Sequence, residues 1–209
     1  MGLDIIGIAS VLVIILFSMI LHELMHGLTA YWLGDDTAKH AGRLTLNPLS
    51  HIDPVTTVLV PVLLYIANLP PFGAAKPVPF NPDRVKFGEF GAALVGIAGP
   101  LTNFVLAFIA YALSLVFAGN VEVVNFLWLA VSVNLSFFAF NIIPIPPLDG
   151  SRVLYAFAPD FVRRGMIAME RYGIYVVFAL VLLAGSVFGN IISTISTFAL
   201  RIFMVVLGH

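Results

Sequence analysis

The chain has 209 residues, of which 60% are hydrophobic and only 10% are charged. Soluble domains carry about 25% charged residues, so this composition predicts an integral membrane protein. Eleven acidic residues against ten basic ones give a net charge of −1, which excludes the basic surface that nucleic-acid binding requires. Cysteine is absent, so disulfides, thiol nucleophiles and cysteine-ligated zinc are excluded. Histidines and carboxylates are the strong metal ligands that remain.

The first apolar segment runs from Asp4 to Leu33, and Glu23 is the only acidic or basic residue between its ends apart from two histidines. At about 1.5 Å per residue, a helix of this length crosses a hydrocarbon core of about 30 Å. The segment lacks the basic start of a signal peptide, so we expect a retained transmembrane helix. We expect the helix to end at Gly34-Asp35-Asp36.

Two polar connections, 34–90 and 149–173, hold nine of the ten basic residues. By the positive-inside rule both connections face the cytoplasm, which places the N-terminus outside. This orientation requires the apolar residues 52–68 to return to the side from which they came. We therefore expect a short β-hairpin or re-entrant element after the first helix, with the alternating residues Arg43-Leu44-Thr45-Leu46 as an edge strand.

Residues 91–148 contain a single charge, Glu122, beside the turn residues Gly119-Asn120. This pattern predicts two spans, at about 91–118 and 123–145, joined by a tight turn on the outer side.

A last apolar run begins at Ile174. We expect one span to about Phe188, then an amphipathic or second membrane segment interrupted by Asn190 and Arg201. The chain as a whole is predicted to be an all-α, polytopic helical bundle of about 4–6 membrane segments, forming one domain over residues 1–209.

The most informative motif lies in the first segment, His22-Glu23-Leu24-Met25-His26. His22 and His26 are one turn apart on one helix face, where both imidazoles can ligate one zinc ion. Glu23 is rotated by about 100° from His22 and can act on a water at such a site as the general base. These groups are costly inside an apolar helix and usually face a polar cavity, which disfavours the alternative that the histidines only bond to neighbouring helices.

A hydrolytic zinc site needs a third protein ligand and an open position for water. Asp149 is the leading candidate, because it follows the third span at the same cytoplasmic end at which His26 lies in the first. Pro144, Pro146 and Pro147 forbid a continuous helix before Asp149 and place it on a rigid, extended segment. The alternative is that Asp149 simply caps a helix beginning at Gly150.

The motifs together resemble the site-2 proteases, the intramembrane zinc metalloproteases of peptidase family M50. The resemblance covers most of the chain and is closest to the short branch, without PDZ or CBS domains. It is carried by four stretches, which are His22 to Gly27, Asn47-Pro48-Leu49-Ser50-His51-Ile52-Asp53-Pro54, Gly99-Pro100-Leu101-Thr102-Asn103, and Asn141 through Asp149-Gly150. In this branch a glycine often follows Asp53-Pro54, whereas this chain has Val55-Thr56.

The resemblance implies one zinc ion on His22, His26 and Asp149, Glu23 as the catalytic base, and Asn141 as a hydrogen-bond donor to the substrate or its oxyanion. It implies a transmembrane protein as the substrate, cleaved in or near its membrane segment. We expect a multi-pass protein of a prokaryotic cell membrane, surrounded by the lipid bilayer, with the active site toward the cytoplasm.

Two further polar residues keep alternative roles at this point. Asn103, three residues after Pro100, can steady a kink in its helix or line the active cavity and bind substrate. His51 can be a fourth polar contact near the metal, although its place beside Asp53-Pro54 favours a turn residue.

The rival hypothesis is a non-catalytic metal-binding protein or a metal transporter on the same helices. A transporter would place further ligands along its path, yet the middle spans offer only Asn, Ser and Thr. A non-catalytic relative would be expected to lack Glu23 or a ligand, and all are present. Proteolysis is therefore favoured.

Overall fold

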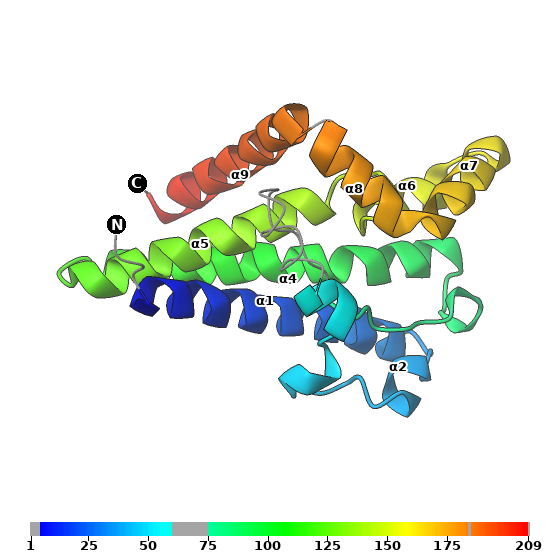
Figure 1. Ribbon diagram of the computed structural model, residues 1–209, viewed down its shortest axis with the longest axis horizontal. Coiled ribbons are helices and arrows are strands. Elements are labelled where there is room, and N and C mark those ends of the chain that lie inside the picture. The colour runs from blue at the N-terminus through cyan, green and yellow to red at the C-terminus, as the bar shows by residue number, and fades with distance from the viewer. Residues whose placement is uncertain (1–4, 60–74, 184, 209) are drawn as a thin grey trace.

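A computed structural model describes residues 5–59, 75–183 and 185–208, and every regular element in these ranges is helical (Figure 1). Four helices are long and apolar enough to cross a membrane, which confirms the prediction of an all-α membrane protein. They are α1 (Ile5–Trp32), α4 (Glu89–Val116), α5 (Val121–Asn141) and α9 (Gly185–Leu207).

Helices α1, α4 and α5 run side by side along the long axis of the molecule, with α4 in contact with both of the others (Figure 1). Helix α9 packs on α5 and α4, toward the end of the molecule at which α1 begins. A buried cluster joins these last three helices through small residues on α4 and aromatic rings from α4 and α9, with Ala107, Ala110, Tyr111, Val131, Leu135, Ala199 and Phe203 as its members. This cluster fixes α5 and α9 on one side of α4 and leaves the other side for α1.

Helix α5 ends at Asn141, four residues before the predicted end of its span. Pro144, Pro146 and Pro147 lack the backbone donor that a continuing helix requires, so the chain leaves the helix as an irregular segment. The turn before α5 is placed as predicted, and Asn120 caps the helix by accepting the Val123 N–H.

The last apolar run is divided differently from the prediction. Helix α8 (Gly173–Leu183) has 11 residues, about 16 Å, which is too short to cross a membrane alone. Helix α9 begins at Gly185 and runs without interruption through Asn190 and Arg201. Neither residue breaks it, and the hydroxyl of Thr194 donates to the Asn190 carbonyl one turn earlier in the same helix.

The predicted edge strand at Arg43–Leu46 is wrong, because no strand occurs in the ranges that the structure describes. The groups of this stretch have other partners: the Arg43 N–H donates to the Ala38 carbonyl, and the Thr45 carbonyl accepts from His51 Nε2. The Arg43 guanidinium donates to the Lys76 carbonyl. The neighbouring extended segment carries Pro77 and Pro79, which have no N–H to offer a ladder. Of the predicted element at 52–68, residues 54–59 form one π-helical turn, and 60–68 lie outside the described residues.

Short elements occupy the connections that follow α1 and α5 in the chain. They are α2 (Thr37–His40), the 3₁₀ turns Pro48–Ser50 and Pro82–Arg84, α6 (Gly150–Phe157) and α7 (Asp160–Arg171). Buried Asp35 joins two of these segments by accepting the N–H groups of Thr37 and Asn81. Arg163 of α7 donates to the Tyr155 and Ala156 carbonyls at the end of α6.

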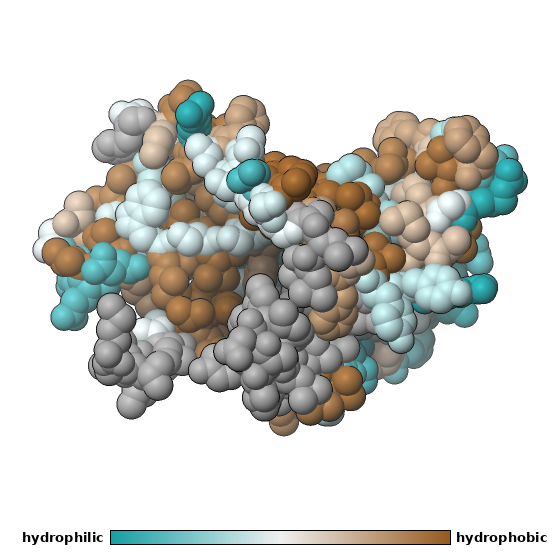
Figure 2. Space-filling model, turned by 45° about the horizontal axis from the view of Figure 1, so that its top comes forward, coloured by the Kyte–Doolittle hydropathy of each residue, from teal (hydrophilic) through white to brown (hydrophobic). Residues whose placement is uncertain are grey.

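The surface agrees with this arrangement. Figure 2 shows hydrophobic residues over much of the face between the two ends of the molecule and hydrophilic residues at the end where α7 lies. Large apolar side chains on the long helices point outward, for example Val116 of α4 and Val205 of α9, which are 75% and 81% exposed. An apolar outer surface on long helices is what a lipid environment stabilises.

Candidate metal centre

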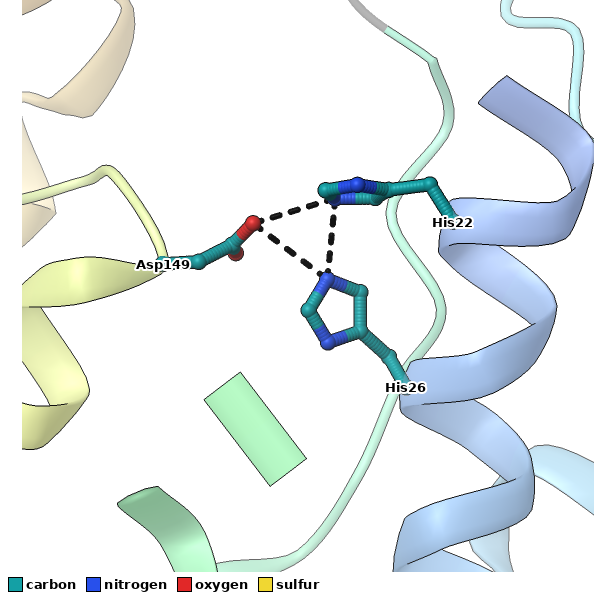
Figure 3. A group of neighbouring side chains, drawn as sticks. All are labelled: His22, His26 and Asp149. Atoms are coloured by element: carbon teal, nitrogen blue, oxygen red, sulfur yellow. Dashed lines mark hydrogen bonds and ion pairs between the residues drawn. The ribbon is translucent and has the colours of Figure 1, made fainter. Parts of the chain in front are cut away.

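Three ligand-type side chains converge on one point between α1 and the segment before α6 (Figure 3). His22 and His26 project from the same face of α1, and their Nε2 atoms are 3.0 Å apart. Asp149 Oδ2 lies 3.0 Å from His22 Nε2 and 3.3 Å from His26 Nε2. Ligand atoms placed tetrahedrally around zinc at its usual bond lengths lie about 3.3 Å apart, so the triangle has nearly the size that zinc requires.

Glycines on α4 allow the two sides of the site to approach. A Cβ atom at Gly99 would lie 2.6 Å from His22 Nε2 and would also overlap His26 Nε2. At Gly96 a Cβ would meet the Asp149 carbonyl at 3.0 Å and the Arg152 side chain at 2.7 Å. Because neither position has a side chain, α1 and α6 both pack directly on the backbone of α4, and their ligands can meet across it.

Asp149 occupies the position before the first residue of α6, but its side chain makes no capping hydrogen bond. The carboxylate instead points toward the two histidines (Figure 3). Its Oδ2 atom is buried and has no hydrogen-bond partner. The geometry therefore favours the ligand over the helix cap, because a buried anionic oxygen without a partner is costly unless a cation joins it.

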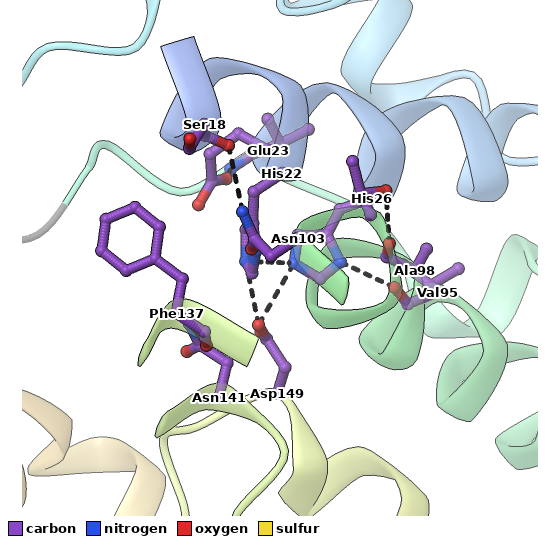
Figure 4. A network of polar contacts seen from close by, with 12 residues as sticks. Ser18, His22, Glu23, His26, Val95, Ala98, Asn103, Phe137, Asn141 and Asp149 are labelled. Carbon is purple, nitrogen blue, oxygen red and sulfur yellow. Dashed lines mark hydrogen bonds and ion pairs between the residues drawn. The ribbon is translucent and has the colours of Figure 1, made fainter. Parts of the chain in front are cut away.

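The histidine Nδ1 atoms both face oxygen atoms. His22 Nδ1 lies 2.6 Å from Asn103 Oδ1, and His26 Nδ1 lies 2.6 Å from the Val95 carbonyl (Figure 4). Both oxygens accept, so each Nδ1 carries the proton and each Nε2 presents its lone pair. Two nitrogen lone pairs and one carboxylate oxygen facing one another at about 3 Å repel without a cation, and zinc fits this donor set.

Glu23 lies beside the three ligands and is not one of them. Its Oε2 atom accepts the backbone N–H of Val78 at 2.9 Å. Prolines 77 and 79 flank Val78, so in this stretch Val78 supplies the donor that its neighbours cannot. One carboxylate oxygen, Oε2, is thereby fixed by the backbone of the segment that carries Val78.

The two predicted substrate-binding asparagines differ in their surroundings. Asn141, at the end of α5, is partly exposed and donates to the Phe137 carbonyl of its own helix. Asn103 is completely buried, and its amide contacts His22, Asn134 and the Ser18 carbonyl.

His51 is buried away from the three ligands. Its Nε2 donates to the Thr45 carbonyl, and its own carbonyl accepts the Lys76 N–H. Among the alternatives for this residue, the structure favours a turn residue.

Three participants were not found from the sequence. The first is Asn134, which is buried in α5. Its sequence signal is an asparagine in an otherwise apolar span, because such a residue needs hydrogen-bond partners. The other two are backbone groups, the Val78 N–H and the Val95 carbonyl, whose roles do not depend on their own side chains. The sequence could point to them only through neighbouring residues, which are Pro77 and Pro79 for Val78 and Gly99 for Val95.

Comparison with known proteins gives consistent results. Residues 117–184 match Peptidase family M50. YwhC of Bacillus subtilis, a zinc metalloprotease by name, is 40% identical over 171 residues, which cover 78% of this chain and 75% of YwhC. The proteins named Rip2, also zinc metalloproteases by name, are 28% identical in Mycolicibacterium smegmatis and 31% in Mycobacterium tuberculosis.

The Rip2 matches cover 80% of this chain but only 64% and 63% of those proteins, so this chain spans somewhat less than two thirds of their length. No solved structure matches the chain. The extent of the YwhC match, together with a metal-ligand triangle that joins the membrane-length helix α1 to the segment before α6, establishes the family relationship. The chain belongs to peptidase family M50, the zinc metalloproteases that include the site-2 proteases.

Proposed function

We propose that the protein is an intramembrane zinc endopeptidase that hydrolyses a peptide bond in or near the transmembrane segment of a membrane-protein substrate. The observation that carries this proposal is the triangle of His22, His26 and Asp149, with Glu23 beside it. Family membership supports the metalloprotease chemistry, and the position of the triangle on a spanning helix supports the membrane location of the cleavage.

The depth of the site follows from its place in α1. His26 and His22 lie roughly 9 and 15 Å along the helix from its end at Trp32. The basic residues of the connections 34–90 and 149–173 support a cytoplasmic location for that end, by the positive-inside rule. The proposed site therefore opens toward the cytoplasmic side of a cell membrane, within the depth that a substrate helix also occupies.

Each residue has a separate task in the proposed reaction. Zinc, when bound by the two histidines and Asp149, supplies a Lewis acid for the scissile carbonyl and makes water more acidic. Glu23 is held by the Val78 N–H through Oε2, takes the proton of the attacking water on Oε1, and returns it to the leaving amine. Asn141 uses one amide hydrogen on the Phe137 carbonyl and keeps the other for the substrate carbonyl.

The test combines zinc analysis of the purified protein with cleavage of a panel of single-span substrates. Glu23→Gln should keep its zinc and lose proteolysis by at least about 10²-fold, since a general base contributes that much. Glu122→Gln makes the same chemical change on an exposed residue at the far end of α5 and should cleave as the wild type does. Near-normal cleavage by Glu23→Gln, or a wild type that binds no zinc, would contradict the proposal.

A further inference from the structure

The two metal-ligand histidines are oriented by different kinds of group. His26 Nδ1 faces a backbone carbonyl, that of Val95. His22 Nδ1 faces a side chain, Asn103 Oδ1, which in turn contacts Asn134 on the next helix. The Nδ1 partner of His22 is therefore a side chain, Asn103, which Figure 4 shows beside it, and Asn103 in turn depends on Asn134 of α5.

The direction of this hydrogen-bond chain is fixed at its far end. The Ala130 carbonyl can only accept, so Asn134 must turn its Nδ2 toward it, at 2.9 Å. Asn134 Oδ1 then faces Asn103 and must receive its Nδ2, at 3.0 Å. The Ser18 carbonyl, 3.5 Å from Asn103 Nδ2, requires the same orientation.

Asn103 Oδ1 is consequently left to face His22, and it can only accept. His22 must carry its proton on Nδ1, which leaves the lone pair on Nε2, at the point where the three ligand atoms meet. The backbone carbonyl of Ala130, on α5, thus determines the state of an imidazole on α1.

Burial makes this control strict. Asn103 and Asn134 are 0% and 3% exposed, so water does not compete for their amide groups. Amides inside a membrane helix are costly when unpaired, and here each satisfies the other. Rotating either amide by 180° would set two acceptors or two donors face to face in a site that excludes solvent.

We propose that Asn103 and Asn134 form a positioning relay that locks His22 in the Nδ1–H tautomer and aims its Nε2 atom at the metal. This proposal rests on the metal-binding part of the proposed function and is independent of which substrate is cleaved. It assigns a role to Asn134 and makes Asn103 a residue that acts through His22.

The test measures zinc affinity of the purified full-length protein by competition with a chelator, and the absorption spectrum of the protein loaded with Co²⁺. Asn103→Leu preserves the shape but removes the acceptor, and zinc affinity should fall by about 10- to 100-fold, as for other partners of metal-bound histidines. The Co²⁺ spectrum should also change. Asn103→Asp restores an acceptor for His22 and should bind zinc more tightly than Asn103→Leu does.

A double-mutant comparison isolates the relay. Asn134→Leu should weaken zinc binding in the wild-type background and add little in the Asn103→Leu background, because both act through His22. Ser114→Ala is the matched control. Ser114 is also buried on α4, and its hydroxyl donates to the Tyr111 carbonyl of the same helix and not to the relay, so zinc affinity should not change.

Unchanged zinc affinity in folded Asn103→Leu, or fully additive effects of the two substitutions, would overturn the relay. A second measurement needs no relay variant to fold. In zinc-loaded wild-type protein labelled with ¹⁵N-histidine, with His22 assigned by comparison with His22→Gln, His22 should carry its proton on Nδ1 and bind zinc through Nε2, and binding through Nδ1 would overturn the proposal. Neither readout involves proteolysis, so a failure of the relay can be distinguished from a failure of the proposed protease function.

Discussion

Adding one methyl group to α4 should disable the metal centre without touching a ligand. The substitution is Gly99→Ala. The new Cβ would lie 2.6 Å from His22 Nε2 and closer still to His26 Nε2. Ordinary contact between carbon and nitrogen needs about 3.5 Å, so the histidines and α4 must separate by about 1 Å.

That displacement is large for a metal site. Metal and catalytic geometries tolerate errors of about 0.5 Å, and a 1 Å misplacement costs about 10²-fold in activity. Asp149 cannot follow the histidines, because its segment packs on Gly96 of the same helix α4. We therefore expect zinc affinity and proteolysis of Gly99→Ala to fall together by about two orders of magnitude.

The assay is chelator competition for zinc, with substrate cleavage measured on the same samples and helix content as the check on folding. Gly189→Ala is the matched control, since a Cβ at Gly189 in α9 meets nothing within 4 Å. Wild-type zinc affinity in Gly99→Ala would refute the argument that this position provides the space for the ligands.

Three other predictions test separate parts of the structure. Asp149→Asn should lose zinc and proteolysis together, because a neutral amide is a poor zinc ligand, whereas asparagine would serve equally well as a helix cap; measured zinc stoichiometry separates the two roles. Burial opposes ionisation of Asp35, but hydrogen bonds from Thr37 and Asn81 outweigh it and lower its pKa. The ionised Asp35 therefore stabilises the fold fully above the ordinary carboxyl pKa, and this effect is lost as pH falls through the lowered pKa. Asp35→Asn should lower the free energy of unfolding by about 1.5–3 kcal/mol near neutral pH, and its melting temperature should fall less steeply with acid than that of the wild type. Cysteines introduced at Asn120 should react with a membrane-impermeant reagent from outside intact cells, and those at Arg164 only after the cytoplasmic side is opened, whereas outside labelling at Arg164 would reverse the proposed topology.

The parts of the fold that sequence predicted well are those set by the membrane. The predicted first helix and the two middle spans differ from α1, α4 and α5 by no more than four residues at any end. Long apolar runs bounded by charges leave few alternatives, because a span must satisfy its own backbone. The proximity of His22, His26 and Asp149 was also anticipated, since helical spacing fixes the first two and the prolines restrict the third.

Two predictions are wrong, the edge strand at 43–46 and the division of the last apolar run, and both depend on interactions between distant parts of the chain. Alternation at Arg43–Leu46 favoured a strand, but a strand needs a partner with free N–H groups, and the adjacent Pro77 and Pro79 lack them. The end of α8 could not be read from the sequence, because no charged residue separates α8 from α9. The partners of Asn103 could not be predicted either, because they lie on two other helices, His22 on α1 and Asn134 on α5.

The metal centre depends on where α4 lacks side chains as much as on its ligands. In a helix, the carbonyl of one residue points toward the residue four positions later, and for Val95 that residue is Gly99. A side chain at Gly99 would cover the Val95 carbonyl, which orients His26, and would fill the space in which the ligand atoms meet. The same helix, one turn later, presents Asn103 to His22. Helix α4 therefore orients both histidines while contributing no ligand, and substitutions on it should change metal binding before they change the fold.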